Sequence, residues 1–240
     1  MLDSLSKNIR FLGGFWGHIL PVRTLQRLMG FRYPDFAGTR YDLCIEGVQR
    51  SGNTFFVALF QHWNPGTSVA HHTHLAATVR YSVRSGIPAV VLIRPPADAI
   101  ASLIIWDSKL SDTVAILSYL LYHHLLWRRR KRFLTLGFDD VVARPDQCIR
   151  QINQHFATAF QWGRFTPEVE LAVAEIIREQ DSLLQRQQRN SSLPNAVKEQ
   201  AAAEVKQRLQ RNILFPPAQR IYRAFSEQAA VIQEVGPDAE

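Results

Sequence analysis

Cysteine is scarce in this sequence. The 240 residues include two cysteines, Cys44 and Cys148, which lie far apart and lack the close spacing of zinc ligands. This excludes a small fold held together by disulfides and favours a reducing compartment. The core must therefore come from apolar side chains, and a chain of this length supplies enough of them for one large domain.

Long hydrophobic runs are also missing. The most apolar stretch is 113–127, TVAILSYLLYHHLLW, which contains two histidines and is shorter than the roughly 20 residues of a membrane span. We expect a buried helix there. The stretch FLGGFWGHIL (11–20) follows basic residues as in a signal peptide, but it carries three glycines and no convincing cleavage site follows. The expected localisation is therefore cytoplasmic.

Internal repeats and low-complexity linkers are absent, which excludes a solenoid. The net charge of +7 is compatible with an anionic ligand, an acidic polymer or an anionic surface, and does not choose among them. No pattern points to nucleic acid. The charge therefore limits the partners without naming one.

The sequence alternates short apolar runs with helical patterns, which predicts a parallel sheet covered by helices on both faces. The run 87–93, IPAVVLI, is rich in β-branched residues and is typical of a central strand. Strands are expected at 41–48, 66–72, 87–93 and 132–138. Helices are expected at 54–63, 75–85, 97–106, 113–131, 145–160, 166–189, 195–211 and 216–234.

The predicted fold class is a three-layer α/β fold like that of P-loop NTPases, with a helical C-terminal third. We expect a single domain. A helical extension at 1–40 precedes a cofactor-binding core at 41–195, and helices at 196–240 pack over one edge of the sheet and cover the site.

Residues 47–54, GVQRSGNT, almost match a phosphate-binding P-loop. The glycines and Thr54 fit that pattern, but Asn53 stands where the phosphate-binding lysine belongs. The loop follows a predicted strand and precedes a helix, the order that directs backbone N–H groups at an anion. Arg50 can supply the missing charge, since a guanidinium forks onto phosphate or sulfate oxygens. The alternative is an ordinary turn with Thr54 as the helix cap.

A second polar segment, IRPPADAIASL (93–103), follows the predicted central strand. Ligands bind beyond such strand ends in open parallel sheets, so Arg94 is a candidate for a second phosphate, with the hydroxyl of Ser102 one turn into the helix. The alternatives are an ion pair between Arg94 and Asp98 and a packed, small Ser102.

Together the two segments resemble the cofactor signatures of the sulfotransferase family, which transfers sulfuryl groups from 3′-phosphoadenosine 5′-phosphosulfate (PAPS). RSGNTF (50–55) is similar to the signature of a basic residue, Ser-Gly, two small polar residues and Trp. RPPADAIAS (94–102) is similar to the signature of Arg, a proline turn with Asp, and a serine eight residues on. The resemblance implies a 5′-phosphosulfate loop of Arg50, Ser51, Gly52, Asn53 and Thr54, an adenine-stacking Phe55, and a 3′-phosphate held by Arg94 and Ser102.

The segment HHTHL (71–75) resembles the family's Lys-Thr-His-Leu stretch, which implies that His74 is the general base. His72 stands where a lysine is usual. From the residues alone, His72 and His74 would lie on one side of a strand, which is also metal-ligand spacing, but no further ligand is close in sequence. A plain surface or core role is the other alternative. No metal site is predicted.

Two further segments resemble the family more loosely. LGFDDVVARPDQ, which begins at Leu136, is similar to a Tyr-Glu-Asp-Leu segment that precedes a proline-led helix. RNSSLPN (189–195) lies where the family has a basic loop over the 3′-phosphate, which implies a contact from Arg189.

The resemblance implies a sulfotransferase, with catalytic Arg50 and His74, that transfers a sulfuryl group to a hydroxyl or amine. Alternatives are an ATP-dependent small-molecule kinase with an altered P-loop and a non-catalytic nucleotide-binding member of the fold. The expected acceptor is a small molecule or a glycan. Residues 1–40 are open to a role in the acceptor pocket, in a dimer or at a membrane surface, and the sequence predicts no oligomeric state.

Overall fold

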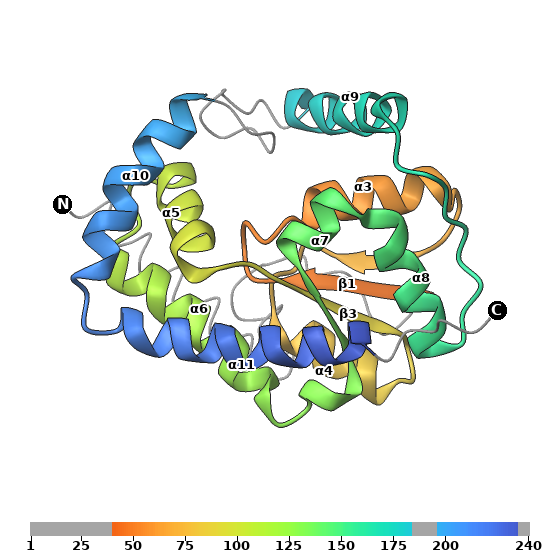
Figure 1. The fold of residues 1–240 in the computed structure, drawn as a ribbon, viewed down its shortest axis with the longest axis horizontal. Helices are drawn as coiled ribbons and strands as arrows, with labels where there is room; N and C mark the ends of the chain where they lie inside the picture. The colour runs from red at the N-terminus through yellow and green to blue at the C-terminus, as the bar shows by residue number, and fades with distance from the viewer. Residues whose placement is uncertain (1–39, 184–195, 235–240) are drawn as a thin grey trace, which may run out of the picture.

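The computed structural model describes residues 40–183 and 196–234 (Figure 1). Within them lies a sheet of four strands in the order β2-β1-β3-β4, and every neighbouring pair is parallel. Each strand falls inside a predicted one, so the α/β class with a parallel sheet is confirmed. The strands are β1 (Leu43–Gly47), β2 (Val69–His71), β3 (Ala89–Ile93) and β4 (Leu134–Gly137).

The strand β3 is internal, as its composition predicts, because it pairs with β1 on one side and β4 on the other. All five residues of β1 and all five of β3 are buried. Val91 and Ile93 belong to one apolar cluster, whereas Val90 and Leu92 belong to another. Since side chains alternate along a strand, the sheet has an apolar core on each face.

Helices cover both faces, which gives three layers (Figure 1). One face packs against α3 (Asn53–Trp63), α7 (Phe138–Ala143) and α8 (Pro145–Phe156). The other face packs mainly against α4 (Ala76–Arg84), α5 (Pro96–Trp106) and α6 (Asp112–Trp127).

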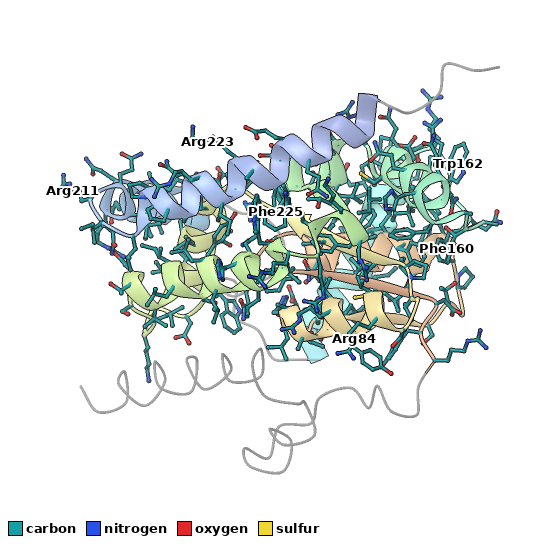
Figure 2. The ribbon with its side chains drawn as sticks, turned by 90° about the horizontal axis from the view of Figure 1, so that it is seen from below. Arg84, Phe160, Trp162, Arg211, Arg223 and Phe225 are labelled. Atoms are coloured by element: carbon teal, nitrogen blue, oxygen red, sulfur yellow. The ribbon has the colours of Figure 1, made fainter. Side chains whose placement is uncertain are left out.

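The C-terminal helices extend these layers. α9 (Pro167–Leu183) packs on the outside of α3, and α10 (Ala196–Gln210) packs along α5. α11 (Phe215–Glu234) lies against α6 and the edge strand β4. Figure 2 shows Phe225 directed from α11 into the molecule, where it is fully buried.

Two predicted helices end earlier than expected. α6 ends at Trp127, and a short 3₁₀ turn, η1 (Arg130–Arg132), follows it. α8 ends at Phe156 because Ala157 adopts a left-handed conformation with φ of 53°. The Asn153 side chain then bonds both backbone groups of Phe160, at 2.8 and 2.9 Å, and folds the chain back.

Two predictions fall largely or wholly outside the described residues, namely the extension at 1–40, apart from Arg40, and the contact from Arg189. In the described parts of the chain, no helix is long and apolar enough to cross a membrane.

Candidate functional site

The carboxyl ends of β1 and β3 form the switch point of the sheet. After β1 the chain moves through α3 to β2 on one side, and then crosses to β3 on the other side of β1. In open parallel sheets this is where ligands bind. The loop after β1 carries Arg50 and the segment after β3 begins with Arg94, so both predicted segments reach this place.

The loop after β1 is tightly folded. Arg50 and Gly52 both have positive φ, at 70° and 93°. A Cβ on Gly47 would lie 2.6 Å from the Leu92 carbonyl oxygen, and one on Gly52 would lie 3.0 Å from the Phe138 ring. Both glycines are therefore needed for the loop to pass close to its neighbours.

The helix α3 begins with its first N–H groups uncapped by any side chain. Its N-cap is Gly52, and its first turn has no acidic residue. Thr54 is thus not the helix cap, and the cap assignment in that alternative is wrong. An uncapped helix start with its positive dipole end favours an anion.

Several buried polar atoms around this helix start have no hydrogen-bond partner in the described structure. They are the Ser51 hydroxyl, both amide atoms of Asn53 and Nε of Arg94. Ser51 is fully buried and Asn53 is 3% exposed. Leaving buried polar groups unpaired costs about 1–3 kcal/mol each, so this set fits a site completed by a polar or anionic ligand.

The two predicted segments meet directly. Nε of Arg50 donates to Oγ of Ser102 at 3.0 Å, although the residues are 52 positions apart. Nη1 of Arg94 donates to the Arg50 carbonyl oxygen at 2.9 Å. Two guanidinium groups and a hydroxyl are thus held together beside the uncapped start of α3.

Arg94 is held from several sides. Its guanidinium carbon lies 4.0 Å from the centre of the Phe138 ring, and the Tyr119 hydroxyl donates to the Arg94 carbonyl oxygen at 2.9 Å. Asp98 pairs instead with Lys206 of α10, so the predicted alternative of an Arg94–Asp98 ion pair is not found. Burial lowers the pKa of Arg94, and nearby Asp98 raises it.

The histidine segment forms a turn after β2. The strand ends at His71, so the expectation that His72 and His74 share one side of a strand is wrong. Both adopt left-handed backbone conformations, with φ of 58° and 54°. Nδ1 of His74 lies 3.0 Å from the Gly47 carbonyl oxygen, and Nε2 of His72 lies 3.1 Å from Oγ1 of Thr54. The turn therefore contacts the loop after β1.

The imidazole of His74 favours its neutral form. Burial lowers its pKa, and the charges of Arg50 and His71 lower it further, whereas the bond to the Gly47 carbonyl raises it. The ring is therefore neutral at neutral pH, with a lone pair on one ring nitrogen, and the neighbouring cations oppose its protonation. In the described parts of the chain, no group of three or more His, Cys, Asp or Glu side chains is placed to hold a metal ion.

No family model and no curated protein matches this chain. Function is therefore inferred from the side chains assembled at the switch point.

Phe55 lies next to the loop but is engaged by other aromatic groups. Its ring meets Phe165 edge-on, with centroids 6.0 Å apart, and it packs against the apolar cluster that joins α3 to α9. A base that stacked on Phe55 would share the ring with this cluster.

Two site residues were missed by the sequence analysis. Phe138 touches both Gly52 and Arg94, and the only signal for it was the loose resemblance of the segment after β4. Glu46 is fully buried in β1 and accepts hydrogen bonds from Thr73 and His74. A carboxylate inside an apolar strand could have indicated it.

Proposed function

We propose that this protein is a PAPS-dependent sulfotransferase that acts on a hydroxyl or amine acceptor. The hydrogen bond between Arg50 and Ser102 is the observation that carries the proposal. It joins the two segments that resemble the family's signatures, at the strand ends where ligands bind in such sheets. The three-layer, P-loop-like identity of the fold belongs to the same proposal.

The proposed binding roles divide the site in two. The loop of Ser51, Gly52, Asn53 and Thr54 receives the 5′-phosphosulfate beside the uncapped start of α3. Arg94 and Ser102 hold the 3′-phosphate, a group that PAPS carries on its ribose and ATP lacks. The unpaired Nε of Arg94 supports this role, because it leaves a buried cationic donor available.

The chemistry follows from two side chains. When bound, PAPS supplies an activated sulfuryl group and leaves as 3′,5′-adenosine bisphosphate. Arg50 stabilises the negative charge that develops during the transfer. His74 takes the acceptor's proton through Nε2, because Nδ1 is engaged by the Gly47 carbonyl.

The sequence left an ATP-dependent kinase and a non-catalytic binder as alternatives. Asn53 counts against the kinase, because its side chain is buried with Oδ1 directed toward Gly47 and cannot act as the missing lysine. His74→Ala distinguishes the enzyme from the non-catalytic binder. In an enzyme this substitution would abolish sulfuryl transfer and leave nucleotide binding intact, whereas a binder would show no activity to lose.

The test is calorimetric binding of 3′,5′-adenosine bisphosphate, compared with ATP and magnesium. We expect the wild type to prefer the bisphosphate. Arg94→Ala removes a charge-assisted contact to phosphate and should weaken bisphosphate binding about 10- to 100-fold.

The matched control is Arg220→Ala, which removes the same charge from an exposed position on α11. It should bind the bisphosphate like the wild type. Preference for ATP, or equal affinity in Arg94→Ala and wild type, would refute the proposed function.

A further inference from the structure

Glu46 is a buried carboxylate that none of the roles above uses. It is the fourth residue of β1 and is fully buried. Its side chain points to the same face of the sheet as Cys44 and Val48, which belong to the apolar core. A carboxylate in such a place is unfavourable unless its oxygens are hydrogen-bonded.

Both oxygens of Glu46 bind the histidine turn. Oε1 accepts from the backbone N–H of Thr73 at 2.8 Å and from its hydroxyl at 2.7 Å. Oε2 accepts from the backbone N–H of His74 at 3.0 Å. The Thr73 hydroxyl also lies 2.6 Å from that of Thr78, which ties the turn to α4.

The turn needs such support because its backbone is strained. His72 and His74 both have positive φ, a conformation that residues other than glycine seldom adopt. Between them, Thr73 makes two of the bonds to Glu46. The Glu46 carboxylate thus binds Thr73, which lies between the two strained histidines. It also binds the backbone N–H of His74, the second of them.

This conformation sets the ring of His74. Its Nδ1 lies 3.0 Å from the Gly47 carbonyl oxygen, which can only accept a hydrogen bond. Nδ1 must therefore carry the hydrogen, and in the neutral ring Nε2 keeps the lone pair. Gly47 directly follows Glu46, so one strand end fixes both the backbone and the ring of His74.

We infer that Glu46 is the positioning residue for His74, and that it fixes the tautomer in which Nε2 acts as the proton acceptor. The catalytic meaning of this inference rests on the proposed function. The fixed tautomer itself does not, and can be observed without a nucleotide or an acceptor.

Glu46→Gln is the informative substitution. The glutamine oxygen can still accept both bonds from Thr73, but its amide nitrogen then faces the N–H of His74 and cannot accept from it. The anchor of His74 is lost while most of the turn is kept. Glu175→Gln is the matched control, because Glu175 is exposed on α9 and pairs with Arg178 at the surface.

The experiment is nitrogen-15 NMR of the full chain labelled in its histidine rings, with His74 assigned from the spectrum of His74→Gln. The wild type and Glu175→Gln should show a single Nδ1–H pattern for His74. Glu46→Gln should show a mixture with the Nε2–H form, which predominates in free histidine. If Glu46→Gln does not fold, Glu46→Asp serves, because its shorter side chain cannot reach both N–H groups.

An Nε2–H pattern in the wild type, or an unchanged pattern in Glu46→Gln and Glu46→Asp, would overturn the inference. Calorimetry with 3′,5′-adenosine bisphosphate on the same samples separates it from the proposed function. Binding within about twofold of wild type in Glu46→Gln, with the tautomer changed, supports both. A changed tautomer in Glu46→Gln, together with a wild type that does not bind the bisphosphate, supports the positioning role and removes the proposed function.

Discussion

At the scale of single residues, the site depends on polar groups that bond across the chain. Glu46 reaches the turn after β2, Arg94 reaches the loop after β1, and Arg50 reaches α5. Each bond joins segments that are distant in sequence. A single substitution at one of these residues therefore affects two segments.

The buried carboxyl of Glu46 makes stability depend on pH. Burial raises its pKa to about 7, although the bonds from Thr73 and His74 act in the opposite direction. Because the folded pKa lies above the ordinary value, its contribution to stability is complete below about pH 4.5 and is lost as the pH rises through about 7. Glu46→Gln does not ionise and lacks this loss.

We therefore expect the stability of wild type, relative to Glu46→Gln, to fall by up to about 3 kcal/mol between acidic and mildly alkaline pH. Urea unfolding of both proteins across this range measures the difference. The comparison with the variant is needed because burial lowers the pKa of His123 to about 4, which acts on stability in the opposite direction. Parallel pH curves for the two proteins would contradict the expectation.

At the scale of elements, the loop between β1 and α3 depends on the segment after β4. Gly52 lies against Phe138, and the guanidinium of Arg94 stacks on the same ring. The ring therefore couples the end of β4 to both predicted binding segments. A side chain at Gly52 would push the ring and disturb Arg94.

Gly52→Ala should cost more than the roughly 1–2 kcal/mol of left-handed strain, because the added Cβ lies 3.0 Å from the Phe138 ring. It should also weaken binding of 3′,5′-adenosine bisphosphate. Gly86→Ala is the control, with a positive φ of 69° and nothing within 4 Å of the added Cβ. Urea unfolding and calorimetry on both variants test this, and equal effects would argue against the role of Phe138.

The sequence predicted the elements well where burial is continuous. The run from Ala89 to Ile93 indicated an internal strand because parallel strands are buried on both faces. The short helix α7 was missed, since its six residues follow β4 without a break. The end of α8 was also missed, because it depends on the Asn153 side chain and on a left-handed Ala157.

At the scale of the whole molecule, α11 closes the core on one face of the sheet. Its Phe225 is fully buried and meets the rings of His123, Trp127 and Phe133. These partners come from α6 and from the residue before β4. The C-terminal helix thus shares one apolar core with the sheet.

Phe225→Ala should lower the free energy of unfolding by about 3–5 kcal/mol, because it leaves a cavity among these rings. Circular dichroism and tryptophan fluorescence should report the same unfolding midpoint, since one core unfolds as a unit. Arg223→Ala, which is exposed on the same helix, should behave like wild type. Separate transitions for the two probes would contradict a single domain.

The sequence indicated which residues could form the site, but not how they meet. Arg50 and Ser102 are 52 positions apart, and their bond depends on the crossing between β1 and β3. The resemblance named His74 as the general base, but the orientation of its ring depends on Glu46, which the sequence places inside a buried strand. Contacts between residues this far apart cannot be predicted from the sequence alone, because they depend on how the strands and helices pack.

The bond between Arg50 and Ser102 also affects which anions the site can select. The bond uses one of the five N–H groups of the Arg50 guanidinium, and Ser102 accepts it while keeping its own O–H as a donor. An anion can therefore be bound by either side chain without breaking the bond. Because the bond holds the two donors at a fixed separation, it favours ligands that present two acceptor groups at a matching spacing.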